Sequence, residues 1–255
     1  MTDTRSAGQD QKHIWKIVKI VPENHDTYSL YLEGSDEKVA RRRAGQFVSL
    51  SIMTSGGWSD PHPFSIANAP EDPVLCLTIK KAGQFTSAIP DFKPGTEVRC
   101  MGPIGLFCKD IDAKPFTVMM AGGVGVTPFL SVLRHFRNIT AKNIVTLFWV
   151  NRSMEDVFAT DELQAMTRDL TLRVVYCLTR VDDVQGYYRQ EYPGVFYEEG
   201  RLSGDILKRH GAAKDASFYL CGPPPMMESA LAEVGNLNVD QGAVEKENFA
   251  WHGKG

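Results

Sequence analysis

The 255-residue sequence contains few cysteines and no long hydrophobic run. It has no C-x-x-C pair and no Cys/His spacing typical of a metal site, so we expect no bound metal, no disulfide framework and a reducing compartment. The sequence also lacks the ~18 consecutive apolar residues of a membrane span. Residues 1–12 form a polar tail without the apolar core of a signal peptide, so we expect a cytoplasmic protein.

An excess of charge of one sign is also missing. The 28 Lys and Arg residues against 31 Asp and Glu residues give a net charge of -3. This balance provides no electrostatic basis for binding nucleic acid or a membrane surface, so we expect neither as a partner. At ~150 residues per domain, the chain has room for one large or two medium domains.

Short strands dominate the N-terminal part of the chain. Runs rich in β-branched and aromatic residues are separated by turn-forming clusters, and no helical period interrupts them. This pattern predicts an antiparallel β-barrel or sandwich over residues 13–111. The strands are expected at Ile14–Val21, Thr27–Leu32, Gln46–Ile52 and Leu75–Lys80.

Strands and helices alternate in residues 112–255, which predicts an α/β domain with a parallel sheet. The polar stretch Lys109–Ala113 marks the expected boundary between the two domains. Strands are expected at Phe116–Met120, Val145–Val150, Leu172–Leu178 and Phe218–Cys221. Helices are expected at Phe129–Phe136, Glu155–Arg168, Leu202–His210 and Met226–Val234.

A glycine-rich turn, Ala121–Pro128, follows the first of these strands and begins a helix, as in a dinucleotide-binding site. Gly123 and Gly125 would let the backbone approach a pyrophosphate. Thr127 is the expected N-cap, and Pro128 suits the first helical position. An ordinary glycine-rich turn is the alternative, because Pro128 stands where G-x-G-x-x-G has its third glycine.

Two further segments carry candidate site residues. Cys221-Gly222-Pro223 lies between a strand and a helix, at the sheet edge where ligands bind in α/β proteins. The alternative is that Cys221 is a small buried hydrophobic residue. His62-Pro63-Phe64-Ser65 offers an aromatic ring and a hydroxyl, which a flavin requires, although a core Phe beside an exposed Ser is equally compatible with the segment.

Together, the three segments resemble the ferredoxin–NADP reductase superfamily, in which an FAD-binding barrel precedes an NAD(P)-binding domain. The usual flavin motif there is R-x-Y-S/T, and His62–Ser65 is a variant similar to that of the ferric reductase and NADPH oxidase branch. The resemblance extends over residues 13–251. Other family-like segments are Ala44–Val48, Lys80–Thr86, Gly102–Phe107, Gly200–Leu202 and Val244–Phe249.

The resemblance implies roles for residues on the flavin side. Phe64 would stack on the isoalloxazine, Ser65 would hydrogen-bond near N5, and His62 would replace the arginine that binds the pyrophosphate. Because a neutral imidazole binds phosphate less well, the choice of FAD over FMN depends on other donors. These donors are expected from Gly83, Gln84, Phe85 and Thr86, and Pro63 is expected to contact the flavin as part of the motif.

The resemblance also implies roles for residues that would contact the nicotinamide nucleotide. Cys221 would lie beside the nicotinamide, Glu247 would close the active site, and Phe249 or Trp251 would cover the other face of the flavin. The NAD(P) pyrophosphate would be held by Gly122, Gly123, Val124, Gly125, Thr127 and Pro128, with Gly222 and Pro223 nearby.

Arg152 and Arg180 follow consecutive strands and could pair with a 2′-phosphate, which favours NADPH over NADH, unless both are solvated surface residues. The resemblance implies an FAD-dependent NAD(P)H reductase that passes electrons to a separate acceptor such as ferredoxin, flavodoxin, a ferric chelate or a partner subunit. The basic triplet Arg41-Arg42-Arg43 would dock an acidic partner or be solvated. The alternative function is an electron-transfer or regulatory subunit that is active only within a larger complex.

Overall fold

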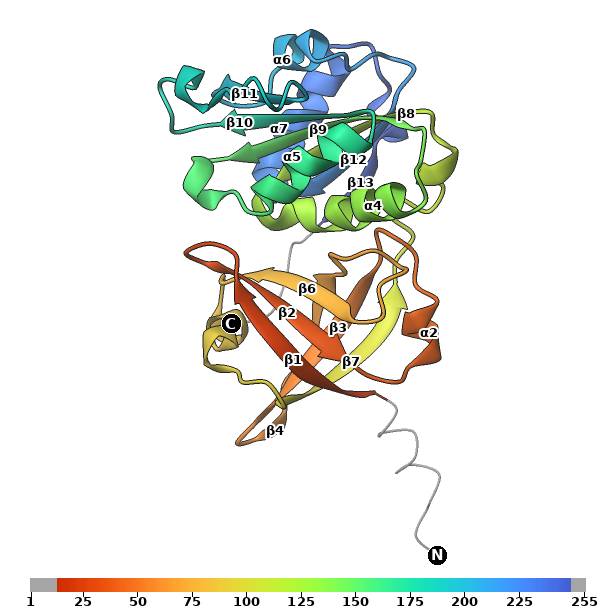
Figure 1. Cartoon of the computed structure of the whole chain (residues 1–255), viewed down its shortest axis with the longest axis vertical. Helices are drawn as coiled ribbons and strands as arrows, with labels where there is room; N and C mark the ends of the chain where they lie inside the picture. The colour runs from red at the N-terminus through yellow and green to blue at the C-terminus, as the bar shows by residue number, and fades with distance from the viewer. Residues whose placement is uncertain (1–12, 249–255) are drawn as a thin grey trace, which may run out of the picture.

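The computed structural model describes residues 13–248, which form a β-barrel below an α/β domain (Figure 1). The barrel strands are β1 (Ile14–Pro22), β2 (Thr27–Glu33), β3 (Phe47–Thr54), β4 (Gly57–Trp58), β5 (His62–Ser65), β6 (Leu75–Lys80) and β7 (Glu97–Ile104). Short helices α2 (Glu37–Ala40), α3 (Gln84–Ser87) and η1 (Ile89–Asp91) connect them.

The barrel strands are all antiparallel, in the order β4-β3-β7-β1-β2-β6, and β5 pairs with β3. A single bridge between Ile66 and Leu77 joins the segment after β5 to β6 and so closes the barrel. Apolar side chains that alternate along the strands fill the interior, among them Ile17, Leu30 and Leu50. The expected antiparallel barrel is confirmed.

The C-terminal strands are β8 (Phe116–Gly122), β9 (Ile144–Asn151), β10 (Leu172–Leu178), β11 (Val195–Glu199), β12 (Ser217–Gly222) and β13 (Glu245–Asn248). The helices are η2 (Ile111–Ala113), η3 (Gly123–Val126), α4 (Thr127–Asn138), η4 (Met154–Asp156), α5 (Thr160–Asp169), η5 (Gln185–Tyr187), α6 (Gly204–Arg209), α7 (Pro224–Gly235) and η6 (Gln241–Ala243).

All pairs in this second sheet are parallel, in the order β11-β10-β9-β8-β12-β13, which confirms the expected α/β domain. Helices α4 and α5 cover one face of the sheet and α6 and α7 the other, and α4 lies between the sheet and the barrel (Figure 1). The chain leaves β8 toward β9 on one side, while β12 lies on its other side. Ligands of open α/β sheets bind at the carboxyl ends of strands at such a switch point.

Two expectations for individual elements were wrong. The helix expected from Glu155 begins only at Thr160, because Val157 and Phe158 turn inward and Ala159 has a left-handed φ of 54°. The Phe158 ring contacts the Trp149 ring edge-on at a centroid distance of 5.1 Å. Strand β11 was not expected at all, because two glutamates end it.

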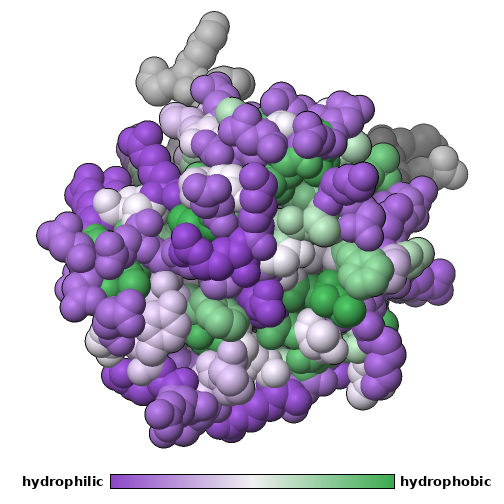
Figure 2. Space-filling model, turned by 90° about the horizontal axis from the view of Figure 1, so that it is seen from above, coloured by the Kyte–Doolittle hydropathy of each residue, from purple (hydrophilic) through white to green (hydrophobic). Residues whose placement is uncertain are grey.

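Seen from above, the α/β domain shows a mainly hydrophilic rim around a central area of mixed polarity (Figure 2). In the described part of the chain, no helix combines the length and apolar composition needed to cross a membrane. Residues 13–248 also contain no group of three or more His, Cys, Asp and Glu side chains that could hold a metal ion.

Candidate cofactor site between the barrel and the parallel sheet

The two glycine turns predicted from the sequence meet at the switch point between β8 and β12. A Cβ added to Gly125 would lie 2.7 Å from the carbonyl carbon of Cys221 and 2.8 Å from the Cα of Gly222. A Cβ on Gly122 would lie 2.9 Å from Cδ of Pro223. Gly125 therefore lies at a tight contact between two backbone turns. It allows the turn after β8 to pack on the turn after β12.

Gly123 is the residue of the first turn that leaves space for a ligand. Its φ of +51° suits glycine, and a Cβ there would have no atom within 4 Å. The indole Nε1 of Trp149, on β9, donates to the Gly123 carbonyl oxygen at 2.8 Å and holds the turn. Nothing in the sequence singles out Trp149, because it lies within an apolar strand.

Thr127 is not the N-cap of α4, contrary to expectation. The turn η3 runs directly into α4, so helical backbone begins before Thr127, and the Thr127 hydroxyl donates to the Val124 carbonyl oxygen at 2.9 Å. Pro128 lies in the first helical turn, where its missing N–H has no cost. Because α4 continues η3, the N–H groups suited to an anion are those at the start of η3.

The ends of β9 and β10 carry polar side chains beside this turn. Asn151 is only 6% exposed, yet neither its side-chain oxygen nor its nitrogen has a hydrogen-bond partner in residues 13–248. Arg152 and Arg180 are exposed, and the Arg180 N–H donates to the Arg152 carbonyl oxygen at 2.8 Å, so the two side chains start from adjacent positions. A buried unsatisfied amide beside two arginines fits a polar, anionic ligand such as a dinucleotide.

Cys221 and Glu247 are register partners on β12 and β13. Cys221 belongs to the cluster of buried side chains on the α4 and α5 face of the sheet, which is the face toward the barrel. Its side chain is 0% exposed, and burial, with a smaller effect of Glu247, raises the pKa of the thiol well above its usual value. A neutral, covered thiol fits neither a nucleophile nor a base, so any role of Cys221 is one of packing against a ligand.

Glu247 has a raised pKa, mainly because burial disfavours its charge and secondarily because Glu245 is near. Glu245, on the same face of β13, accepts a hydrogen bond from the Cys108 N–H at 2.6 Å and so ties β13 to the chain after the barrel. Its pKa is also raised, chiefly by burial.

We expect Glu247→Gln to flatten the dependence of stability on pH. A carboxyl group whose pKa is raised by folding stabilises the fold below its unfolded pKa, and this stabilisation is lost as pH rises through the folded pKa. The wild type should therefore lose stability between about pH 4.5 and the raised value, whereas the glutamine variant should not. The difference at pH 7 should stay below ~1 kcal/mol, because the half-buried group is screened by solvent.

Urea unfolding at pH 5 and at pH 8 measures this difference. Glu155→Gln is the control, because Glu155 is exposed and the substitution should change the two free energies equally. A wild type and a Glu247→Gln variant with the same pH slope would contradict the prediction.

The barrel side of the site is a row of rings from β5 and α3. The centroids of His62 and Phe85 are 4.1 Å apart, and those of Phe64 and Phe85 are 5.8 Å apart. Burial lowers the pKa of His62, although Asp60 opposes the shift, so the imidazole is neutral at pH 7. The rings fit a stacked aromatic ligand, and His62 supplies no fixed positive charge for a phosphate.

Ser65 is the buried residue at the end of β5, directly after Phe64. Its side chain is 5% exposed, and its hydroxyl makes no hydrogen bond to any described residue. The Thr86 hydroxyl accepts from the N–H groups of Ala82 and Gly83 at 2.8 Å and 3.1 Å. Thr86 thus fixes the loop before α3 rather than pointing a free donor outward, while Gly83 leaves open space beside it.

The two sides of the site are joined through α4 and β6. Strand β6 contacts η3, and α4 packs on the segment that follows β5. The structure thus brings the β5 motif, both glycine turns and Glu247 to the junction of the two halves. Phe249 and Trp251, the two expected aromatic covers, lie outside the described residues.

The basic triplet is not a uniform docking surface, contrary to one expectation. Arg42 is 6% exposed, and its guanidinium donates to the carbonyl oxygens of Ala69 and Asp72 at 2.9 Å and 2.7 Å. Arg43 donates to the Gly105 carbonyl oxygen at 3.1 Å, which leaves only Arg41 exposed. Arg42 is a structural residue that holds the loop after β5.

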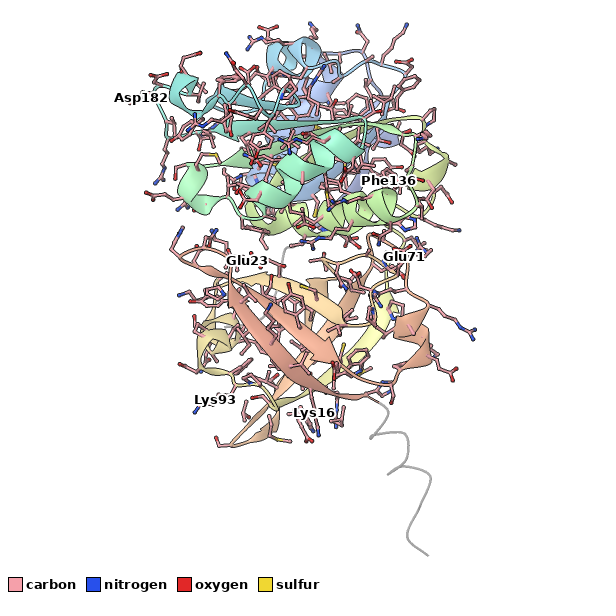
Figure 3. All side chains as sticks on the ribbon, in the orientation of Figure 1. Lys16, Glu23, Glu71, Lys93, Phe136 and Asp182 are labelled. Carbon is pink, nitrogen blue, oxygen red and sulfur yellow. The ribbon has the colours of Figure 1, made fainter. Side chains whose placement is uncertain are left out.

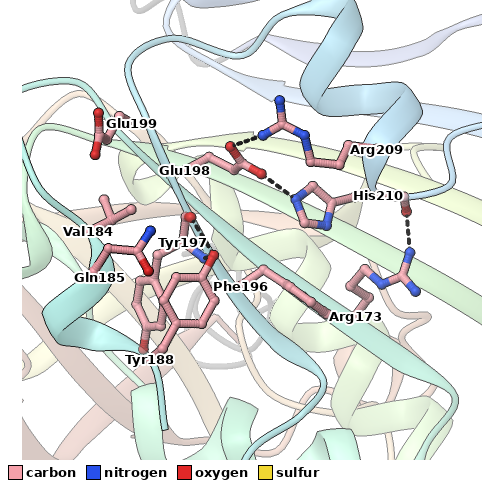
Figure 4. Close-up of a pocket in the computed structure, with 10 residues that line it drawn as sticks. All are labelled: Arg173, Val184, Gln185, Tyr188, Phe196, Tyr197, Glu198, Glu199, Arg209 and His210. Carbon is pink, nitrogen blue, oxygen red and sulfur yellow. Dashed lines mark hydrogen bonds and ion pairs between the residues drawn. The ribbon is translucent and has the colours of Figure 1, made fainter.

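A separate cavity of about 480 Å³ lies at the edge strand β11 (Figure 4). Glu198 binds both Arg209 and His210 there, each at 2.6 Å. The Tyr188 hydroxyl donates to the Tyr197 carbonyl oxygen at 2.8 Å and accepts from its N–H at 3.2 Å, which covers the strand edge. None of the site residues predicted from the sequence lines this cavity.

Comparisons with known proteins also assign different ligands to the two halves of the chain. Residues 13–99 match the FAD-binding domain family, and residues 119–231 match the oxidoreductase NAD-binding domain family. The propane 2-monooxygenase reductase component of Mycolicibacterium goodii is 29% identical over 241 residues, which cover 92% of this chain and 66% of that protein. One subunit of the Na(+)-translocating NADH-quinone reductase of Neisseria meningitidis is 29% identical over 203 residues, covering 73% and 48%. The chain thus spans less than two thirds of the length of these relatives.

Solved structures share the fold at low sequence identity. A ferredoxin NADP+ reductase from Neisseria gonorrhoeae, with bound FAD and NADP, superposes with a TM-score of 0.73 at 18% identity and covers 93% of this chain and 98% of its own. The cytochrome b5 reductase domain of Ulva prolifera nitrate reductase gives a TM-score of 0.76 at 18% identity, covering 92% and 96%. Both show that this chain shares its two-domain fold with reductases.

Proposed function

Because the chain belongs to the ferredoxin–NADP reductase superfamily, we propose that it is an FAD-dependent NAD(P)H reductase that delivers electrons to a separate protein or metal acceptor. We assign the flavin to residues 13–111 and the nicotinamide nucleotide to residues 112–255. When bound, FAD supplies the group that accepts hydride and releases single electrons.

One observation carries the proposal: the glycine turns after β8 and β12 meet at the switch point, on the side of the sheet that faces the β5 motif. A nicotinamide nucleotide held by Gly123 and by the start of η3 would extend toward Cys221 and Glu247. A flavin stacked on Phe64 would approach from the barrel. Hydride transfer between stacked rings then depends mainly on their positioning.

The residues of this chain bind and orient, and the reacting groups belong to the cofactors. The Asn151 amide and the Gly123 turn would hold the nucleotide, and the covered Cys221 side chain would pack beside its nicotinamide ring. Ser65 would donate its unpaired hydroxyl to the flavin near N5. Burial raises the pKa of Glu247, which would favour the protonated form of this carboxyl next to the ring pair.

The test is to purify the chain with FAD, release and identify the cofactor, and titrate anaerobically with NADH and with NADPH. We expect a yellow protein that is bleached by at least one nucleotide and reoxidised by a ferric chelate or by ferredoxin. A protein that binds no flavin, or whose flavin neither nucleotide reduces, would refute the proposal.

We expect NADPH to be preferred, because Arg152 and Arg180 are exposed, adjacent and without side-chain hydrogen bonds or ion pairs to any described residue. Replacing both by alanine should lower kcat/KM for NADPH by about 10- to 100-fold, since charge-assisted bonds to a phosphate contribute ~1.5–3 kcal/mol. The value for NADH should change less than about threefold. Steady-state kinetics with both nucleotides measure this, and an equal loss for both would show that the arginines do not read the 2′-phosphate.

We further propose that the chain lies closer to the ferric reductase and NADPH oxidase branch of the superfamily, because His62–Ser65 replaces R-x-Y-S/T.

A second candidate function is an electron-transfer protein that works only within a larger complex. Its support is that the chain spans only part of relatives that are named as a reductase component and as one subunit of a larger enzyme. Slow bleaching by nucleotide that is accelerated by a partner protein would favour this second function.

A further inference from the structure

One face of α4 is bonded along its length to the barrel segment that follows the flavin motif. The Ser131 hydroxyl donates to the Asn68 carbonyl oxygen at 2.7 Å, and the Arg134 guanidinium donates to the Ala67 carbonyl oxygen at 2.7 Å. The next residue of α4, His135, binds Glu71. Figure 3 shows Glu71 on the barrel directly below α4. We call this set of contacts the α4 seam.

Arg134 is the central residue of the α4 seam. Besides Ala67, its guanidinium binds the carboxylate of Glu162 on α5, with a distance of 2.8 Å between Nε and Oε1. One planar side chain thus fixes three parts of the protein: α4, α5 and the barrel. This geometry requires the planar guanidinium of an arginine, whose several N–H groups can bind a carboxylate through two bonds and also reach the Ala67 carbonyl oxygen. The single ammonium group of a lysine cannot make all of these bonds at once.

Ala67 and Arg134, the two residues joined by this hydrogen bond, both lie in rigid parts of the fold. Ala67 lies two residues after Ser65, is 0% exposed, and its N–H donates to the Cys76 carbonyl oxygen at 2.8 Å. Arg134 lies on the helix that continues η3 without a break. The seam therefore links the flavin motif to the nucleotide turn through packed backbone, with no flexible loop between them.

We propose that Arg134 is a positioning residue for hydride transfer, acting through the Ala67 carbonyl to set the place of β5 relative to the glycine turn. The inference rests on the proposed reductase function. It goes further, because Arg134 lies outside both cofactor motifs. A displacement of ~1 Å between donor and acceptor can lower a rate by ~100-fold, so even a small loosening of the seam should be measurable.

The test compares Arg134→Lys with Arg137→Lys in the FAD-loaded protein. Arg137 lies on the same helix but pairs with the exposed Asp169 at 2.7 Å, and it makes no bond to the described residues of the barrel. At saturating nucleotide, we expect the flavin reduction rate of Arg134→Lys to fall about tenfold, while FAD content and nucleotide Kd stay within about twofold. Arg137→Lys should match the wild type in all three measurements.

Ser131→Ala is the second variant, because it removes one seam bond without touching Glu162, and its rate should fall by about threefold. Wild-type reduction rates in both seam variants would overturn the inference while leaving the reductase function intact. An Arg134→Lys variant whose rate is normal but whose nucleotide Kd rises would also overturn it. A wild-type protein whose flavin is not reduced by either nucleotide would instead refute the proposed function.

Discussion

Gly125→Ala is expected to destabilise the protein strongly and to abolish nicotinamide nucleotide binding. The added Cβ would lie 2.7 Å from the carbonyl carbon of Cys221 and 2.8 Å from the Cα of Gly222, and neither backbone atom can move aside as a flexible side chain would. Forcing an extra methyl group into such a site costs ~1–3 kcal/mol or more. For a chain of this length, the melting temperature should fall by ~5 °C or more.

The effect on binding should exceed the effect on stability. In the proposed nucleotide site the two turns act together, so separating them would displace Gly123 and the start of η3 from the ligand. We expect nucleotide Kd to rise by at least about 100-fold at a temperature where the variant is still folded. Thermal melting with and without nucleotide measures both quantities, because a ligand that binds only the native state raises the melting temperature.

Two other glycines serve as controls. Gly186 is exposed, a Cβ there would meet no atom within 4 Å, and its alanine variant should change stability by less than ~0.5 kcal/mol. Gly123 is also open, but its φ of +51° should make its alanine variant less stable by ~1 kcal/mol. A Gly125→Ala variant that is as stable as Gly186→Ala, and still binds nucleotide, would contradict the packing argument.

Most of the fold was predictable because the hydrophobic pattern follows the strand and helix periods. The strands expected at Ile14–Val21 and Leu75–Lys80 are β1 and β6. The hydrophobic pattern does not reveal an element whose side chains also serve another purpose. Strand β11 lies at the sheet edge and ends in Glu198 and Glu199, and charge on an edge strand prevents aggregation but conceals the strand from a hydrophobicity argument.

The site was predictable as a set of motifs but not as a geometry. The sequence places glycines at 123 and 125, yet only the pairing of β8 with β12 shows that Gly123 has open space beside it and that Gly125 packs against the backbone of Cys221. The same limit applies to Asn151 and Arg42. Whether a polar side chain is buried, and whether it finds a partner, depends on contacts between segments far apart in sequence.

Ser65→Ala is expected to slow flavin reduction by about 100-fold, with FAD content and nucleotide Kd little changed. Ser65 is 5% exposed, and its hydroxyl bonds to no described residue, so it can donate a hydrogen bond to a ligand. A preorganised donor aimed at the atom where charge changes contributes ~10²–10³-fold to a rate. Because the methyl group of alanine fits the same space, folding should not be affected.

Rapid mixing with saturating NADH or NADPH under anaerobic conditions measures the reduction rate. Ser51→Ala is the matched control, since Ser51 is also 5% exposed and lies on the neighbouring strand β3, and its variant should reduce flavin at the wild-type rate. Ser65→Thr keeps the hydroxyl and should restore most of the rate lost in the alanine variant. If Ser65→Ala and Ser51→Ala react equally fast, the hydroxyl takes no part in hydride transfer, and Ser65 serves only to pack β5 against the parallel-sheet domain.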